Sequence, residues 1–196
     1  MFTGIIQDLG SIKHIENGLY QILTNLNLVH LKEGSSISCN GVCLTAKNIK
    51  KNEKNSFTFD VNIGEETLLR TNLGQNISNN EKINLETSLK IGDEIGGHFV
   101  YGHVDKITNI KEIVKLKNSW EYHFVKNFDK NNKFIAEKAS ISINGVSLTI
   151  AYVKDDSFMV SVIDHTFNNT NLKFLNINDA VNIEFDYLAR FVSKNG

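Results

Sequence analysis

A tandem repeat spans nearly the whole chain and limits the folds that it can adopt. The decapeptide ISCNGVCLTA at residues 37–46 recurs as ISINGVSLTI at residues 141–150, with seven of the ten positions identical. Further segments match in the same order at offsets between 98 and 104 residues. A unit of that length is too long for a solenoid repeat and has the size of a domain. We therefore expect two similar domains, at residues 1–96 and 97–187, followed by a helical tail at 188–196.

Strand signals dominate both units. Apolar and polar residues alternate along residues 57–61, 120–124 and 158–162, which is typical of half-buried strands. Turn signals separate about six such strands per unit, as in a small sandwich or a closed barrel. Helical signals are confined to short stretches at residues 65–73 and 165–172 and to the tail at 187–192. The sequence predicts an all-β protein.

The opening repeat has the pattern of a β-hairpin. An Asn-Gly pair between apolar strands favours a type I′ turn, because both central residues need positive φ. With Asn144 and Gly145 at the turn, Ser142 faces Ser147, and an apolar face lies opposite a polar one. In the first copy this register places Cys39 and Cys43 on opposite faces. They are then unable to form a disulfide or share a metal.

The composition argues against several classes of protein. The net charge is −1 and the lysines are scattered, so no basic groove for nucleic acid is indicated. No apolar run reaches the roughly 18 residues of a membrane span, and the first residues lack the pattern of a signal peptide. Two cysteines suit a reducing cytosol as well as a single disulfide. We expect a cytoplasmic protein that binds neither nucleic acid nor membranes.

The segment GDEIGGHFVYGHVD at residues 92–105 is rich in glycine and histidine. No helical pattern follows it, so a dinucleotide site is not supported. On a strand, His98 and His103 would point to opposite faces, which argues against a shared metal. Asp186 follows an apolar strand, and its counterpart in the first unit is Ser88. From the residues alone, His103 is better explained as a structural or surface histidine, and Asp186 as a surface charge at the end of a strand.

Taken together, the motifs resemble riboflavin synthase of the alpha-chain type, over nearly the whole chain and in order. The family fold implies two tandem six-stranded Greek-key β-barrels with a short C-terminal helix. The resemblance also implies a homotrimer, with active sites between the first barrel of one subunit and the second barrel of a neighbour. Two molecules of 6,7-dimethyl-8-ribityllumazine would yield riboflavin and 5-amino-6-(ribitylamino)uracil by transfer of a four-carbon unit, without metal or cofactor. The motifs are MFTGII, SISCNGVCLTA, ETLLRTNL, GDEIGGHFVYGHVD, SISINGVSLTI, HTFNNTNL and VNIEFDYLARFV.

The resemblance assigns site residues position by position. Ser147 and His103 would take part in proton transfer or activation of a nucleophile, Asp186 would orient or polarise that site, and Cys43 would contact the partner lumazine. The pocket of the first half would use Gly4, Ile5, Ile6, Cys43, Leu44, Thr45, Asn62, Ile63, Gly64, Glu65, Glu66 and Thr67. The pocket of the second half would use Gly102, His103, Val104, Lys138, Ser147, Leu148, Thr149, Ser161, Val162, Ile163, Asp164, His165 and Thr166.

The sequence departs from the family at a few positions and leaves alternatives open. Asp164 stands where the family has proline, and only six residues follow Arg190. A non-catalytic carrier of flavin or lumazine has related barrels, and a tandem-barrel module for another ligand is a third hypothesis. The motifs GHVD, SLT and HT in the second half favour the enzyme. Which barrel holds the donor, and any association with lumazine synthase, stay open.

Overall fold

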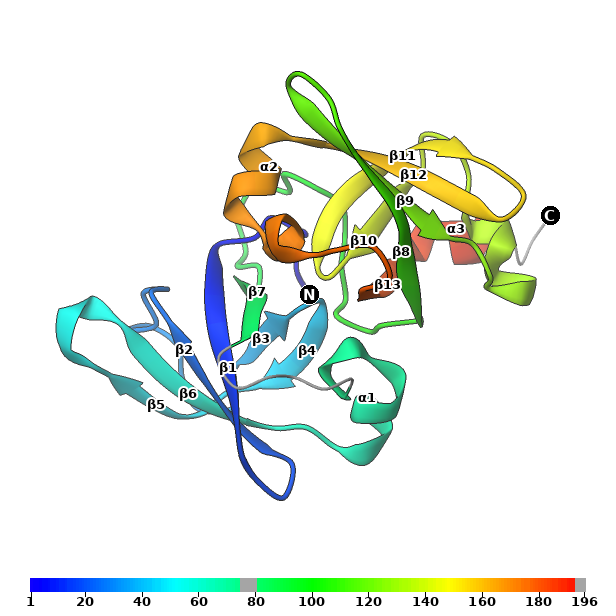
Figure 1. Cartoon of the computed structure of the whole chain (residues 1–196). Helices are drawn as coiled ribbons and strands as arrows, with labels where there is room; N and C mark the ends of the chain where they lie inside the picture. The colour runs from blue at the N-terminus through cyan, green and yellow to red at the C-terminus, as the bar shows by residue number, and fades with distance from the viewer. Residues whose placement is uncertain (75–80, 193–196) are drawn as a thin grey trace.

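Two strand-rich barrels lie side by side, with the N-terminus between them (Figure 1). The structure is a computed structural model and describes residues 1–74 and 81–192 of the chain. The first barrel comprises strands β1 to β7 and the second comprises β8 to β13, which confirms the predicted all-β pair of barrels.

The first barrel is a seven-stranded antiparallel sheet in the order β4-β3-β7-β1-β2-β6-β5. Its two end strands, β4 and β5, follow one another in the chain with only Ala46 between them. They correspond to one bent strand of a six-stranded unit. The strands are β1 (Asp8–Glu16), β2 (Leu19–Thr24), β3 (Ser36–Cys39), β4 (Val42–Thr45), β5 (Lys47–Lys51), β6 (Phe57–Asn62) and β7 (Glu81–Thr87).

The second barrel is closed, in the order β10-β11-β12-β9-β8-β13. This order matches that of the first barrel when β11 takes the place of β4 and β5 together, so the repeat in sequence is also a repeat in topology. The strands are β8 (Lys106–Lys115), β9 (Ser119–Val125), β10 (Ser140–Ile143), β11 (Val146–Val153), β12 (Ser157–Ile163) and β13 (Ala180–Phe185).

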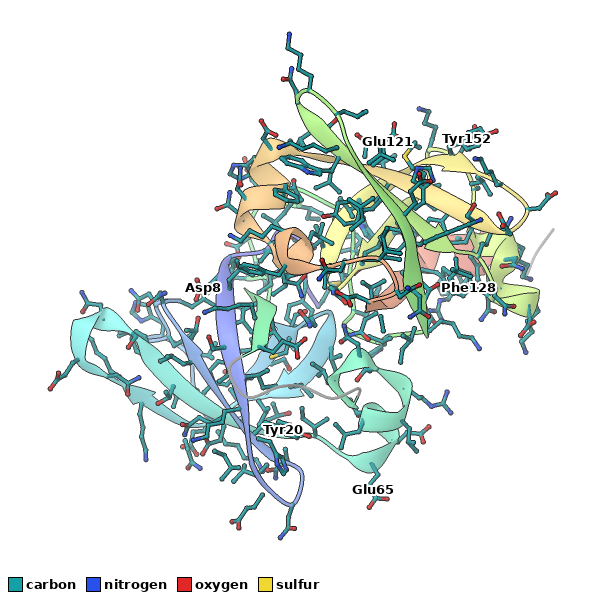
Figure 2. The ribbon with its side chains drawn as sticks, viewed as in Figure 1. Asp8, Tyr20, Glu65, Glu121, Phe128 and Tyr152 are labelled. Atoms are coloured by element: carbon teal, nitrogen blue, oxygen red, sulfur yellow. The ribbon has the colours of Figure 1, made fainter. Side chains whose placement is uncertain are left out.

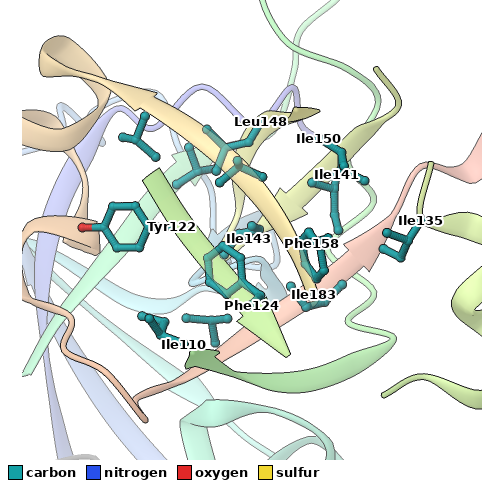
Figure 3. Packing of buried hydrophobic residues seen from close by; sticks show 14 of the residues in the cluster. Ile110, Tyr122, Phe124, Ile135, Ile141, Ile143, Leu148, Ile150, Phe158 and Ile183 are labelled. Carbon is teal, nitrogen blue, oxygen red and sulfur yellow. The ribbon is translucent and has the colours of Figure 1, made fainter. Parts of the chain in front are cut away.

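The alternating apolar residues belong to the cores of the two barrels, and Figure 2 shows side chains of both barrels around the strands. Phe158, Val160 and Val162 of β12 are almost fully buried and pack with Tyr122 and Phe124 of β9 (Figure 3). The Tyr122 hydroxyl donates a hydrogen bond of 2.9 Å to the carbonyl oxygen of Leu172, so the ring is buried without an unpaired hydroxyl. The predicted alternation is confirmed. Burial of these apolar side chains is the main stabilising contribution to each barrel.

Short helices follow the strands where the sequence indicated them. They are α1 (Glu65–Arg70) after β6, α2 (Asp164–Asn169) after β12 and α3 (Tyr187–Val192) after β13, while residues 193–196 of the expected tail lie outside the described residues. The described residues also form four 3₁₀ turns: Glu53–Asn55, Asn72–Gly74, Asp129–Phe134 and Asn171–Phe174.

Helix α3 is attached to the segment that precedes the second barrel. The Tyr187 ring lies 4.7 Å from the Tyr101 ring, and Arg190 forms an ion pair with Asp105. Within the described ranges, no helix is both long and apolar enough to cross a membrane.

The two barrels meet through paired turns and buried asparagines. A Cβ atom added to Gly41 would lie 2.7 Å from the backbone nitrogen of Gly145, so the two hairpin turns touch directly. Around them, each barrel contributes a turn asparagine, a strand asparagine and a 3₁₀ asparagine. Hydrogen bonds link them across the interface into two triads: Asn40, Asn84 and Asn171, and Asn72, Asn144 and Asn182. Because buried amides need partners, this network fixes how the barrels pack.

Candidate active site

The hairpin of each repeat places one reactive side chain beside the barrel contact. The predicted register is confirmed: Ser142 pairs with Ser147 in the second copy, and Ser38 pairs with Cys43 in the first. Ser38 and Ser142 are buried, whereas Cys43 and Ser147 keep partial exposure. The polar face of each hairpin is therefore divided between the contact with the other barrel and an accessible part.

The segments that open the two repeats, residues 2–7 and residues 100–105, each contact the hairpin of the other barrel, an arrangement called here the exchange of opening segments. The backbone N–H of Ser147 donates to the Gly4 carbonyl oxygen at 2.8 Å, and that of Cys43 donates to the Gly102 carbonyl oxygen at 2.9 Å. Gly4 and Gly102 have φ of +77° and +78°, and a Cβ atom on either would lie 2.6 Å from the Cβ of the residue that it faces. Both the conformation and the close approach require glycine.

This exchange corrects the predicted grouping of the pockets. Gly4, Ile5 and Ile6 were expected beside Cys43, but Gly4 faces Ser147 and Ile6 packs on the core of the second barrel. Conversely, Val104 packs on the core of the first barrel. Sequence reasoning assumed that each segment stays with its own repeat. The exchange places each next to the opposite hairpin.

Ser147 is hydrogen-bonded to a histidine that the sequence analysis had not assigned to the site. The Ser147 Oγ lies 2.7 Å from Nδ1 of His98, and the His98 backbone N–H donates to the Thr3 carbonyl oxygen at 3.1 Å. Burial lowers the pKa of His98, and the charge of Asp186 opposes that shift. The imidazole is therefore neutral at neutral pH, and it can accept a proton from a hydroxyl group.

His103, the histidine that the resemblance selected, lies in the segment that contacts the hairpin of Cys43, not in the segment beside Ser147. It is exposed, follows Gly102 in the segment that faces Cys43, and lies near the Tyr101 ring at 6.4 Å between centroids. Within one chain the structure does not bring it to Ser147. Residues 97–105 lie outside the named strands, so the alternation argument that separated the two histidines does not apply to them.

The remaining predicted residues surround the hairpins of both barrels. Leu44 and Leu148 belong to the two cores, and Thr45 and Thr149 are exposed beside them. Residues 62–67 run from the end of β6 into α1, with Glu65 projecting outward in Figure 2, and residues 161–166 run from β12 into α2. Asp164, the departure from the family pattern, is the first residue of α2. Lys138 has a φ of +68° and lies just before β10.

Cys43 and Cys39 are free thiols. Cys39 is fully buried, and burial raises the pKa of its thiol, whereas Cys43 is partly accessible. Over residues 1–74 and 81–192, no three histidine, cysteine or acidic side chains gather in a way that could hold a metal ion.

Comparison with known proteins defines the class. The family model described as lumazine binding domain matches twice, at residues 3–88 and 101–186. The protein is thus a tandem lumazine-binding-domain protein, and each match covers one barrel. It belongs to the riboflavin synthase family. It is 40% identical to riboflavin synthase of Actinobacillus pleuropneumoniae, over 99% of this chain and 89% of that protein, and 38% identical to that of Brucella abortus, over 99% and 97%.

The fold has close counterparts among solved structures. The crystal structure of LumP complexed with riboflavin superposes with a TM-score of 0.79 at 24% identity, covering 94% of this chain and 99% of that one. At that identity the likeness concerns the fold.

Proposed function

We propose that this chain is a riboflavin synthase. Two molecules of 6,7-dimethyl-8-ribityllumazine would react, one donating a four-carbon unit to the other, to give riboflavin and 5-amino-6-(ribitylamino)uracil. The observation that carries the proposal is the hydrogen bond between Ser147 and His98 within a tandem lumazine-binding fold. Two similar barrels offer two similar pockets for two copies of one substrate. Among the described residues, only Ser147 has a partly buried histidine hydrogen-bonded to its hydroxyl oxygen.

The chemistry suits this pair. The 7-methyl protons of the lumazine are acidic because the ring delocalises the resulting anion, so orientation and modest acid–base assistance are sufficient. In the tautomer of neutral His98 that carries its proton on Nε2, Ser147 donates to Nδ1, and the serine oxygen gains basic character toward a bound substrate or water. Asp186 favours the protonated imidazole that results. Cys43, with His103 nearby, would contact the second lumazine. No step requires a metal or a redox cofactor.

We propose the following assignment of substrate contacts, now regrouped by the exchange of segments. The pocket beside Ser147 takes residues 4–6, Lys138, residues 147–149 and residues 161–166. The pocket beside Cys43 takes residues 43–45, 62–67 and 102–104. The contacts that place each opening segment on the opposite barrel support this grouping.

A turnover assay tests the function. Purified protein is mixed with 6,7-dimethyl-8-ribityllumazine alone, and flavin absorbance is followed. We expect flavin to appear together with half an equivalent of the uracil product per lumazine consumed. Binding of lumazine without flavin formation would favour a non-catalytic carrier, and no binding would favour a module for another ligand.

We further propose a homotrimer in the cytoplasm, with active sites between subunits. Leu188 and Phe191 of α3 are more than half exposed and offer apolar surface for contact between subunits, and the two free thiols suit a reducing compartment. We retain residue 96 as the boundary between the domains. Light scattering coupled to size-exclusion chromatography tests the trimer, and an elution mass of one chain would contradict it.

A further inference from the structure

Two buried glutamates occupy equivalent positions in the two barrels. Glu86 lies in β7 and Glu184 in β13, at 3% and 5% exposure. The hydrogen-bond donors to these two carboxylates are backbone N–H groups and one hydroxyl. A buried carboxylate requires such partners, because removing the charge from water is otherwise unfavourable.

Both carboxylates bind the exchanged opening segments. Glu86 Oε1 accepts hydrogen bonds from the backbone N–H and hydroxyl of Thr3 at 2.7 and 2.8 Å, and its Oε2 accepts from the Gly4 N–H at 3.0 Å. Glu184 accepts from the N–H groups of Tyr101 at 2.6 Å, Gly102 at 2.8 Å and His103 at 2.9 Å. Each carboxylate thus gathers successive N–H groups of one irregular segment.

The same segments are hydrogen-bonded to the two residues that carry the reactive side chains, Ser147 and Cys43. The peptide of Gly4 is bound by Glu86 on its N–H side, and its carbonyl receives the N–H of Ser147. The peptide of Gly102 links Glu184 to Cys43 in the same way. Glu86 belongs to the first barrel and Ser147 to the second, while Glu184 and Cys43 stand in the reverse relation.

We infer that Glu86 and Glu184 are positioning residues, each of which sets the geometry of the reactive side chain in the opposite barrel. Glu86 fixes Ser147 through Gly4, and Glu184 fixes Cys43 through Gly102. The inference deepens the proposed function and rests on it for the catalytic consequence. A purely structural anchor would stabilise the segments without distinguishing the two reactive positions.

Thiol reactivity separates these two roles without any need for turnover. In the experiment, the full-length protein is treated with iodoacetamide and the rate of alkylation of Cys43 is measured, with buried Cys39 as an internal reference. In a Cys43→Ser, Ser147→Cys background, the accessible thiol lies at the second hairpin instead. Glu184→Gln should change the rate at position 43 by about threefold or more, because thiol reactivity follows the local environment, and should leave the rate at position 147 unchanged. Glu86→Gln should change the alkylation rate at position 147 by a similar factor and leave the rate at position 43 unchanged.

A control and a second pair of variants keep the test decisive. Glu112→Gln alters an exposed glutamate of β8 and should change neither rate. If a glutamine variant does not fold, Glu86→Asp or Glu184→Asp keeps the charge and shortens the reach by one methylene. Equal effects of both variants on both thiols, or no effect on either, would overturn the inference. These outcomes do not depend on flavin formation, so a failure of the proposed function is recognised separately.

The catalytic consequence has its own readout. In the turnover assay, Glu86→Gln should lower kcat by about tenfold or more with little change in KM, because a displaced reactive group weakens the chemical step more than binding. A change confined to KM would contradict a positioning role for Glu86.

Discussion

The backbone N–H of Ser147, in the second repeat, donates a hydrogen bond of 2.8 Å to the carbonyl oxygen of Gly4, near the N-terminus. The hydrogen bond ties the opening segment of the first repeat to the hairpin of the second. The site beside Ser147 therefore consists of residues from both repeats, and substitutions in either repeat should affect it.

Substitution of Gly4 by alanine should disable the site. The new Cβ would lie 2.6 Å from the Ser147 Cβ, and the positive φ adds strain. We expect flavin formation to fall by at least about 10²-fold, as for displacement of a catalytic group by about 1 Å. Gly34→Ala is the matched control, because Gly34 has a φ of +87° with no atom near the added Cβ. If both variants lose activity equally, the close contact is not the cause.

Ser147→Ala and His98→Gln should lower turnover far more than lumazine binding. Both remove the pair that we assign to proton transfer, and loss of general acid–base catalysis typically costs about 10²–10⁴-fold in rate. Turnover and the fluorescence of bound lumazine would be measured in parallel. His30→Gln, which changes an exposed histidine, should behave as wild type. Wild-type rates in both site variants would refute the assigned roles.

Cys43→Ser tests whether the two hairpins need different chemistry. The change makes the first hairpin match the second at this position, with a smaller and less nucleophilic atom. We expect reduced turnover with the fold retained, measured by flavin formation and circular dichroism. Full activity would mean that the difference between Cys43 and Ser147 has no catalytic purpose.

Asn182→Ala should destabilise the contact between the barrels. The Asn182 amide makes three buried or part-buried hydrogen bonds, to the N–H and side chain of Asn72 and to the Asn40 carbonyl oxygen. Its removal leaves these partners unsatisfied, which should lower the free energy of unfolding by about 3 kcal/mol in urea titrations. Asn109→Ala removes one exposed hydrogen bond and should change stability by less than about 0.5 kcal/mol. Similar losses in the two variants would contradict the role of the network.

The free energy of unfolding should depend on pH through the ionisation of Glu184. Burial raises the pKa of Glu184 from 4.5 to about 7, although three backbone N–H groups oppose the shift. The folded state then binds a proton more readily than the unfolded state, so the stabilisation is complete below pH 4.5 and is lost as the pH rises through about 7. The free energy of unfolding of wild type, minus that of Glu184→Gln, should therefore fall between about pH 5 and pH 8. A difference that stays constant over this range would contradict the shift.

Local features of this fold follow from the sequence. The Asn-Gly turns fixed the hairpin register, and the alternation at residues 57–61 and 158–162 correctly marked buried strands, because both signals depend on neighbouring residues alone. The short helices after β6 and β12 and the terminal helix also lie where their patterns indicated.

Relations between the repeats could not be predicted in the same way. The opening segments share a glycine and apolar neighbours, so their pattern fits either barrel equally well, and the exchange depends on contacts between distant parts of the chain. The strand argument that separated His98 from His103 does not apply to an irregular segment, and nothing in the sequence placed His98 beside Ser147. In the sequence, Glu86 and Glu184 are only the last residues of two matching segments, INLE at 83–86 and VNIE at 181–184. Their partners are backbone groups that a sequence does not mark.

The contact between the hairpin turns bears on how the two copies have diverged. After a duplication, each copy is free to accept substitutions that the other does not share, as Cys43 and Ser147 illustrate. Gly41 and Gly145 lack that freedom, since each leaves no room for a side chain on the other. The asparagines around them, at positions 40 and 144, 84 and 182, and 72 and 171, are likewise the same in both copies. The two copies thus keep the same glycines and asparagines around the contact between the turns, whereas Cys43 and Ser147 beside it differ.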